Sequence, residues 1–101
     1  MTAGEKKRQS RNIIGKRVKE ARQFYLPPLT QDQLSGKLAA EGLPLDRVAI
    51  AKIETGIRCV FDFEVRGLAS VLKVTPGWLL GIEPGATRGE TWLQKNRKRE
   101  V

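Results

Sequence analysis

The chain has 101 residues, a length that suffices for one small domain with one hydrophobic core. Nineteen lysines and arginines stand against 11 acidic residues, and the resulting net charge of +8 favours a polyanionic partner such as nucleic acid. Histidine, the commonest general base and metal ligand, is absent, so we expect neither an enzyme nor a metal or cofactor site.

Charge and hydrophobic periodicity divide the chain into three parts. Residues 1–12 are predicted to be a basic, flexible N-terminal arm, residues 13–82 a folded domain, and residues 83–101 a basic C-terminal tail. Basic segments attract phosphates without contributing sequence information. The single cysteine, Cys59, cannot form an internal disulfide, and no long apolar run is present. We therefore expect a cytoplasmic protein without membrane association.

Start and stop signals predict the first two helices of the domain. The first is expected over Ile13–Tyr25, because apolar residues recur at helical spacing and the two prolines that follow resist the helical conformation. The second begins after Thr30, whose hydroxyl is placed to form a capping box with Gln33, and extends through Glu41. Gly36 is expected to weaken this helix relative to alanine.

The third helix is expected between Asp46, a capping residue, and Gly56, which reaches the left-handed conformation without strain. Ile50 and Ile53 lie three residues apart on this helix and are predicted to face a core. The other faces of the helix then carry Arg47, Val48, Ala51, Lys52 and Thr55.

Two further helices complete the predicted domain. The fourth is expected over Asp62–Lys73, with Asp62 as its cap because Phe61 has no hydroxyl. The fifth is short, with Thr75 as its cap and Pro76 at its first position, where a missing N–H does no harm. Since no segment alternates with the period of a strand, the predicted fold class is all-α.

Several motifs, taken in order, resemble the phage-repressor and Cro-like helix-turn-helix family, often called the XRE family. They include Ile14-Gly15, Leu29-Thr30-Gln31, Lys-Ile-Glu-Thr-Gly at 52–56 and Trp78-Leu79-Leu80-Gly81. No single motif is specific, but the ordered set is. The resemblance implies a five-helix lambda-repressor-like DNA-binding domain that contains a helix-turn-helix. Such domains bind a palindromic operator in double-stranded DNA as a homodimer, with the third helix in the major groove.

The resemblance also implies which residues contact DNA. Gln31 is expected to bond a phosphate and to brace the third helix. Arg47 is expected to bind a guanine, Val48 to pack on a thymine methyl group, and Lys52 to bind a guanine or a phosphate. Ala51 would allow close approach of the backbone, and Thr55 and Arg58 would contact the sugar–phosphate backbone. The expected DNA-binding set is Gln31, Arg47, Val48, Ala51, Lys52, Thr55 and Arg58.

One charged pair is expected to be structural. Arg22 and Glu54 match an arginine and a glutamate that in this family form a partly buried ion pair between the first and third helices. The chain also departs from the common short form of the family, because the segment between Leu38 and Val48 is longer. In this longer-turn variant of the family, the sequence does not fix the angle at which the third helix would dock on DNA.

The function implied is that of a sequence-specific transcriptional regulator, a repressor of bacterial or phage type. Two alternatives stay open: a DNA-binding antitoxin that also binds a toxin, and a protein-interaction adaptor that has kept the fold and lost DNA binding. Gln31, Arg47 and Lys52 favour DNA, because an adaptor would be free to carry acidic or apolar residues at these positions.

Overall fold

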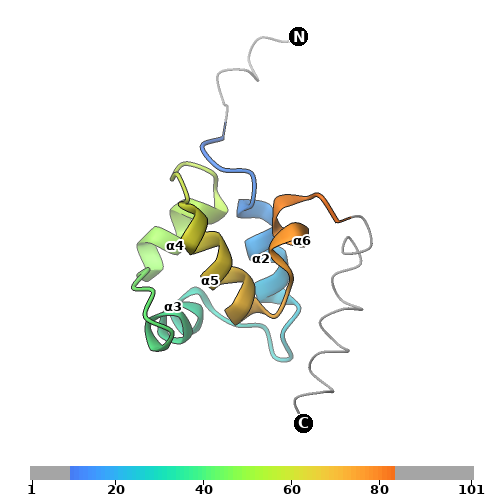
Figure 1. Ribbon diagram of the computed structural model, residues 1–101. Coiled ribbons are helices and arrows are strands. Elements are labelled where there is room, and N and C mark those ends of the chain that lie inside the picture. Colours follow the sequence, from blue (N-terminus) through green and yellow to red (C-terminus); the bar gives the residue numbers. More distant parts are fainter. Residues whose placement is uncertain (1–9, 84–101) are drawn as a thin grey trace.

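The computed structural model describes residues 10–83, and within that range the chain forms helices and no strand (Figure 1). The prediction of an all-α class is therefore confirmed for the described part. Most of the predicted basic arm and nearly all of the predicted basic tail lie outside it. The helices, in chain order, are α2 (Gly15–Gln23), α3 (Gln31–Ala40), α4 (Arg47–Glu54), α5 (Asp62–Leu72) and α6 (Pro76–Leu80).

Three helices begin at the capping residues that the sequence predicts. The Thr30 hydroxyl accepts from the Gln33 N–H at 3.0 Å, and the Gln33 side chain accepts from the Thr30 N–H at 2.8 Å, which completes the capping box of α3. Asp46 accepts from the Ala49 N–H at 2.8 Å at the start of α4. At the start of α6, the Thr75 hydroxyl accepts from the Trp78 N–H at 3.0 Å.

The start of one helix and the capping residue of another differ from prediction. α2 begins at Gly15 rather than Ile13, and its capping position belongs to Ile14, which makes no side-chain capping contact. The Asn12 side chain accepts from the Ile14 and Gly15 N–H groups at 3.0 and 2.8 Å and so satisfies two donors at the start of the helix. At α5 the capping position belongs to Phe61 and not to Asp62. The Glu64 carboxylate accepts from the Phe61 N–H at 2.9 Å, and the Glu64 N–H donates to the Phe61 carbonyl oxygen at 2.9 Å.

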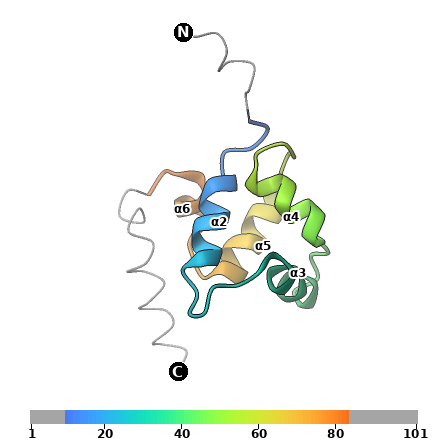
Figure 2. The same cartoon turned by 180° about the vertical axis from the view of Figure 1, so that it is seen from behind.

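α3 and α4 lie on one side of the domain and α6 on the other, with α2 and α5 between them (Figures 1 and 2). α4 packs on both α3 and α2, and α5 packs on α2, α3 and α6. One hydrophobic core fills the space between the helices. Its fully buried large side chains are Ile14, Val18, Leu34, Leu38, Ile50, Ile53, Leu68, Leu72, Trp78 and Leu79.

A glycine allows the start of α2 to touch the end of α4. A Cβ atom on Gly15 would overlap the carbonyl oxygen of Ile53 and would lie 3.0 Å from that of Glu54. Gly56 then ends α4 with φ +84°, as predicted from the sequence. The C-terminal end of α4 is thus held against α2 by backbone-to-backbone contact.

We expect Gly36→Ala to raise the free energy of unfolding by about 1 kcal/mol, because alanine is the better helix former at an interior position. A Cβ at Gly36 would meet no other atom within 4 Å, so the substitution adds no clash. Urea denaturation measures the change. Gly42→Ala is the matched control, since its Cβ also meets open space but its φ is +85°, and it should lower stability. A destabilising Gly36→Ala would contradict the assignment of this position to a helix interior.

Candidate nucleic-acid interface

α4 has one buried and one exposed face. Ile50 and Ile53 are completely buried against the core, as their spacing predicts. Val48 is 52% exposed, and Arg47 and Lys52 are also exposed. Of the remaining residues expected to contact DNA from this helix, Thr55 is exposed and Ala51 is half-buried. α4 therefore presents two cations and a small apolar side chain outward from a rigid base.

Arg47 makes a weak contact with the neighbouring helix. Its Nε lies 3.5 Å from a carboxylate oxygen of Asp32 on α3, and the two side chains are 59% and 76% exposed. An ion pair this exposed contributes less than about 1 kcal/mol, because water and salt screen it. The Arg47 guanidinium is therefore free to exchange Asp32 for another acceptor at little cost.

The opposite end of α4 is held by a buried carboxylate. Arg22 and Glu54 are paired as the sequence predicts: Arg22 Nε and Nη2 donate to the two carboxylate oxygens at 2.7 and 2.9 Å. Arg22 Nη1 also donates to the carbonyl oxygen of Leu29 at 2.8 Å. The Glu54 side chain is only 4% exposed. This ion pair joins α2, the segment before α3 and the end of α4.

Gln31, at the first position of α3, also contacts Glu54, so Arg22, Glu54 and Gln31 form one cluster. Its Nε2 donates to Glu54 Oε1 at 3.0 Å, so α3 and α4 are joined by a direct side-chain contact. This is the bracing contact that the resemblance implied for Gln31. Its contact with a phosphate stays a prediction.

Arg58 has a structural role that the sequence analysis did not anticipate. Its Nη1 and Nη2 donate to the Glu64 carboxylate at 3.0 and 3.2 Å, and Nη1 also donates to the Cys59 carbonyl oxygen at 2.8 Å. The hydrogen bond to Glu64 raises the pKa of Arg58 above its usual value, so the group stays charged. A DNA contact by Arg58 stays a prediction, but most of its donors are used inside the domain.

Glu64 is buried, and its lowered pKa predicts that the fold loses stability in acid. Burial by itself would raise the pKa of Glu64, but hydrogen bonds from Arg58 and from the Phe61 N–H outweigh burial and lower it. A carboxylate whose pKa is lower in the folded state stabilises the fold above its unfolded-state pKa. That contribution is lost as the pH falls through the folded-state value.

We therefore expect the wild-type free energy of unfolding to fall as the pH is lowered from neutral to strongly acidic, in part through protonation of Glu64. Glu64→Gln should be less stable than wild type at neutral pH, because Arg58 loses its ionic partner. It should also lose less stability on acidification. Urea denaturation at a series of pH values measures both effects. A Glu64→Gln profile parallel to that of wild type would contradict the prediction.

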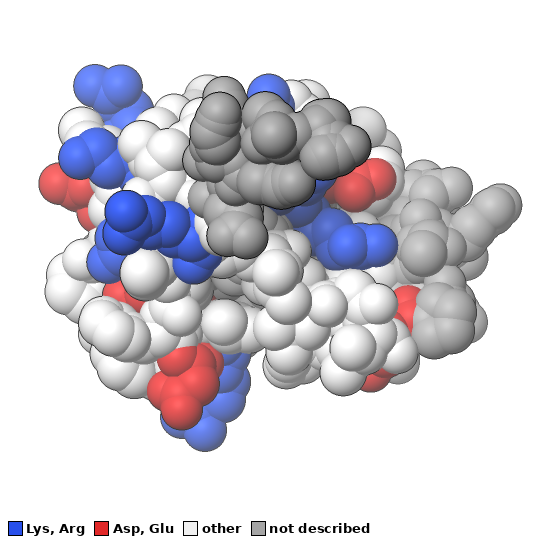
Figure 3. All heavy atoms as spheres, turned by 90° about the horizontal axis from the view of Figure 1, so that it is seen from above, with Lys and Arg blue, Asp and Glu red and all other residues white. Residues whose placement is uncertain are grey.

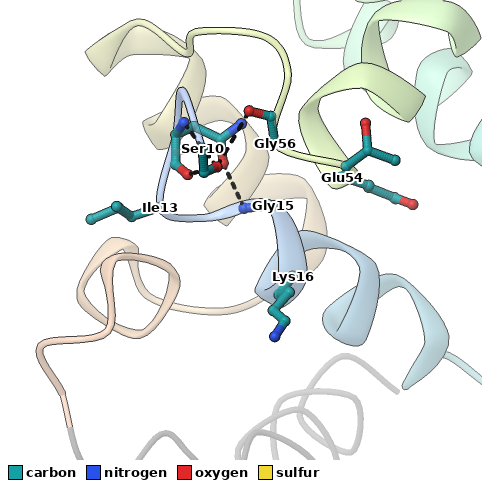
Figure 4. Close-up of a pocket in the computed structure, with 8 residues that line it drawn as sticks. Ser10, Ile13, Gly15, Lys16, Glu54 and Gly56 are labelled. Atoms are coloured by element: carbon teal, nitrogen blue, oxygen red, sulfur yellow. Dashed lines mark hydrogen bonds between the residues drawn. The ribbon is translucent and has the colours of Figure 1, made fainter. Parts of the chain in front are cut away.

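Asn12 is a residue of this region that the sequence analysis missed. Its amide Nδ2 donates to the carbonyl oxygens of Ile53 and Arg58 at 3.1 and 2.9 Å, and its Oδ1 accepts from the Gly15 N–H at the start of α2. Figure 4 shows the neighbouring Ser10 between the start of α2 and Gly56. The only available signal was a capping residue type just before the first helix. Its contacts with the end of α4, more than 40 residues away, left no trace in the local sequence.

A shallow hollow beside the exposed face of α4 is rich in cations. Viewed from above, several Lys and Arg side chains lie on the side of the molecule where α3 and α4 lie, and others lie on the opposite side (Figure 3). The hollow contains three cations, Arg11, Lys52 and Arg58, and one acid, Asp46. Its remaining lining residues are Val48, Ala49, Ile57 and Cys59. Arg11 is held here because its backbone N–H donates to the Gly56 carbonyl oxygen at 2.7 Å.

Two kinds of feature are absent from the described residues. None of their helices has both the length and the apolar character needed to cross a membrane. Residues 10–83 also contain no group of three or more Cys, Asp or Glu side chains arranged to hold a metal ion.

The chain matches no protein-family model, and no match was found among the curated proteins or the solved structures.

Proposed function

We propose that the protein is a sequence-specific double-stranded DNA-binding regulator of transcription, with the lambda-repressor-like fold of the phage-repressor and Cro-like helix-turn-helix proteins. In this proposal α3 and α4 form the helix-turn-helix, and α4 enters the major groove. The observation that carries the proposal is the two-sided character of α4. Its inner face is buried at Ile50 and Ile53, and its outer face offers Arg47, Val48 and Lys52 to a ligand.

The dimensions and chemistry of α4 suit the major groove. An α-helix with its side chains is about 10–12 Å across, which fits the width of about 12 Å of the major groove, and the eight residues of α4 make a helix about 12 Å long. Arg47 has the planar fork that matches O6 and N7 of guanine, and Val48 offers an apolar surface suited to a thymine methyl group. The Arg22–Glu54–Gln31 cluster holds the helix rigidly from behind, so these side chains start from a defined position.

Repression would follow from occupancy of an operator. A homodimer related by a two-fold axis would place its two α4 helices in successive major grooves about 34 Å apart and would recognise a palindromic site. The cations around the hollow beside α4, together with the basic segments at 1–12 and 83–101, would add phosphate contacts that do not depend on sequence.

Selection from a pool of random duplexes tests this proposal, followed by affinity measurements at several salt concentrations. We expect a palindromic motif and an affinity that falls steeply as salt rises. A steep salt dependence without a motif would favour a non-specific DNA-binding protein. Absence of binding at low salt would contradict the proposal and favour the protein-interaction adaptor.

We expect Arg47→Ala to relax base preference at one position of each half-site and to reduce affinity there by about 1–3 kcal/mol, because a guanine loses a bidentate partner. Binding titrations on duplexes that carry each base at that position measure the effect. Lys37→Ala is the matched control, since Lys37 is an exposed cation on α3 that lines a different hollow, beside Tyr25 and Val71. If both variants weaken all duplexes equally, the assigned face of α4 is wrong.

A further inference from the structure

Two aromatic rings at the start of α5 are exposed beside the cation-rich hollow. Phe61 and Phe63 are 58% and 57% exposed, and neither is among the residues that form the hydrophobic core. Their rings stack on each other, with centroids 5.6 Å apart and planes inclined by 22°. Because the inner faces cover each other, the exposed area of each ring lies on its outer face and its edges. We call Phe61 and Phe63 the aromatic pair.

The aromatic pair is joined to the hollow through one carboxylate oxygen. Glu64 Oε1 accepts from Arg58 Nη1 at 3.0 Å and from the Phe61 N–H at 2.9 Å. Arg58 lines the hollow together with Lys52 and Arg11. The guanidinium group of the hollow and the backbone that carries the aromatic pair are therefore bound to the same atom, and rings and cations form one continuous surface.

We propose that this surface binds a single-stranded polynucleotide, with an unpaired base stacked on the aromatic pair and the neighbouring phosphates over the cations of the hollow. The inference goes beyond the proposed function, because the ligand is an unpaired strand and not a duplex. It does not depend on recognition of base pairs by α4.

The chemistry of the aromatic pair favours an unpaired base over other ligands. Every nucleobase has a flat π face, and stacking of such faces on aromatic side chains is a main contact of proteins that bind single strands. In a duplex the faces of the bases are covered by their neighbours in the stack, so only an unpaired base can offer one. Two rings that already stack on each other can extend this stack without rearrangement.

The charges around the rings favour an orientation with the phosphates over the hollow. Arg11, Lys52 and Arg58 attract them there, and Asp46, the acid that also lines the hollow, is already engaged as the cap of α4. Asp62, between the two aromatic residues in sequence, is exposed and repels a phosphate. The base of a bound nucleotide, and not its phosphate, should therefore lie over the rings.

Fluorescence anisotropy with a labelled strand of about ten thymidylates and the full chain tests the proposal. We expect Phe61→Leu/Phe63→Leu to reduce the affinity at least about tenfold, because leucine is apolar but has no ring on which a base can stack. Phe61→Tyr/Phe63→Tyr keeps both rings and should bind as wild type. Both variants should keep the wild-type melting temperature, since the substituted side chains are more than half exposed.

A strand of the same length made of abasic sites separates stacking from charge. It carries the same phosphates without bases, so the wild-type chain should bind it more weakly than thymidylates. The leucine double variant should bind the abasic strand as tightly as wild type does, which is the signature of a contact between ring and base. Lys52→Ala should instead weaken binding of both strands and reduce the dependence of affinity on salt.

Two more measurements complete the test. Ile82→Ser, which removes an exposed apolar side chain after α6, should leave the affinity for both strands unchanged. A uridylate strand of equal length then distinguishes the two sources of unpaired bases. Binding of either polynucleotide that requires the aromatic pair supports the proposal, and the tighter one identifies the ligand as DNA or RNA.

Each remaining outcome has a defined meaning. The proposal is overturned if no single strand binds, if the leucine double variant binds thymidylates and uridylates as wild type does, or if it loses as much affinity for the abasic strand. A folded tyrosine double variant that binds as weakly as the leucine variant also overturns it. If no duplex motif can be selected but strand binding requires the aromatic pair, the proposed function fails and this inference stands. A selected motif without any effect of the aromatic pair on strand binding gives the reverse result.

Discussion

Arg22→Ala should lower the free energy of unfolding by about 3–5 kcal/mol, one of the two largest effects expected for this chain. The Glu54 carboxylate, which is 4% exposed in the wild-type structure, would lose two of its three side-chain donors, and a buried charge without its partner is strongly destabilising. The Leu29 carbonyl oxygen would also lose a donor. Urea denaturation at neutral pH measures the change.

Two further variants distinguish the cost of the unpaired Glu54 charge from the cost of losing the packing of the Arg22 stem. Arg22→Met keeps an aliphatic stem of similar length but should be destabilising as well, because it leaves the Glu54 charge stranded. The double variant Arg22→Met/Glu54→Met removes both charges and should recover most of the stability. Arg47→Ala breaks an exposed pair and should change stability by less than about 1 kcal/mol. An unchanged melting temperature for Arg22→Ala would contradict the prediction.

The two ion pairs also predict a division between stability and DNA binding. Arg22 points into the domain and is tied to Glu54, whereas Arg47 is exposed on the proposed DNA-binding face. Well below its melting temperature, Arg22→Ala should therefore retain most of its intrinsic affinity for the selected duplex. Arg47→Ala should show the opposite behaviour, with lower affinity and nearly unchanged stability.

Helix starts that depend on a nearby side chain could be predicted from the sequence. Thr30, Asp46 and Thr75 each accept from an N–H three residues later, so the interaction is contained in one turn of the chain. α2 starts two residues later than predicted, and the cap of α5 lies one residue earlier than predicted, at Phe61. Asn12 and Glu64 accept from backbone N–H groups at these two helix starts, and each also contacts Arg58, which lies outside that turn of the chain.

For the candidate interface, the sequence predicted which face of α4 is exposed but not which of its side chains are held by distant residues. The spacing of Ile50 and Ile53 was enough to separate the buried from the exposed face of α4, because periodicity reports which side of a helix meets the core. Composition could not show that Arg58 is engaged by Glu64, since a surface arginine and a paired arginine look alike in a sequence. The exposure of Phe61 and Phe63 was equally hidden, because apolar residues near a helix start normally predict burial.

Asn12→Asp should lower the free energy of unfolding by about 2–4 kcal/mol, because two carbonyl oxygens lose their donor and face a negative charge. The carbonyl groups are those of Ile53 and Arg58, which now accept from Asn12 Nδ2 at 3.1 and 2.9 Å. Aspartate keeps an oxygen that can accept from the Gly15 N–H, so this contact at the start of α2 is retained. The substitution therefore isolates the contact with the end of α4 and with the segment that follows it.

The pH dependence of Asn12→Asp distinguishes this explanation from a general disturbance of the N-terminal segment. When the introduced carboxyl is protonated it can donate one hydrogen bond, so the stability difference from wild type should shrink on acidification. A disturbance of the chain path would be independent of pH. Ser10→Ala removes a hydroxyl that donates to the Asn12 and Gly56 carbonyl oxygens, and it should cost less than about 1 kcal/mol because neither hydrogen bond is fully buried. Asn12 contacts the C-terminal end of α4, the helix that carries Arg47 and Lys52. A large pH-dependent loss would therefore show that a residue before α2 stabilises the packing of this helix in the domain.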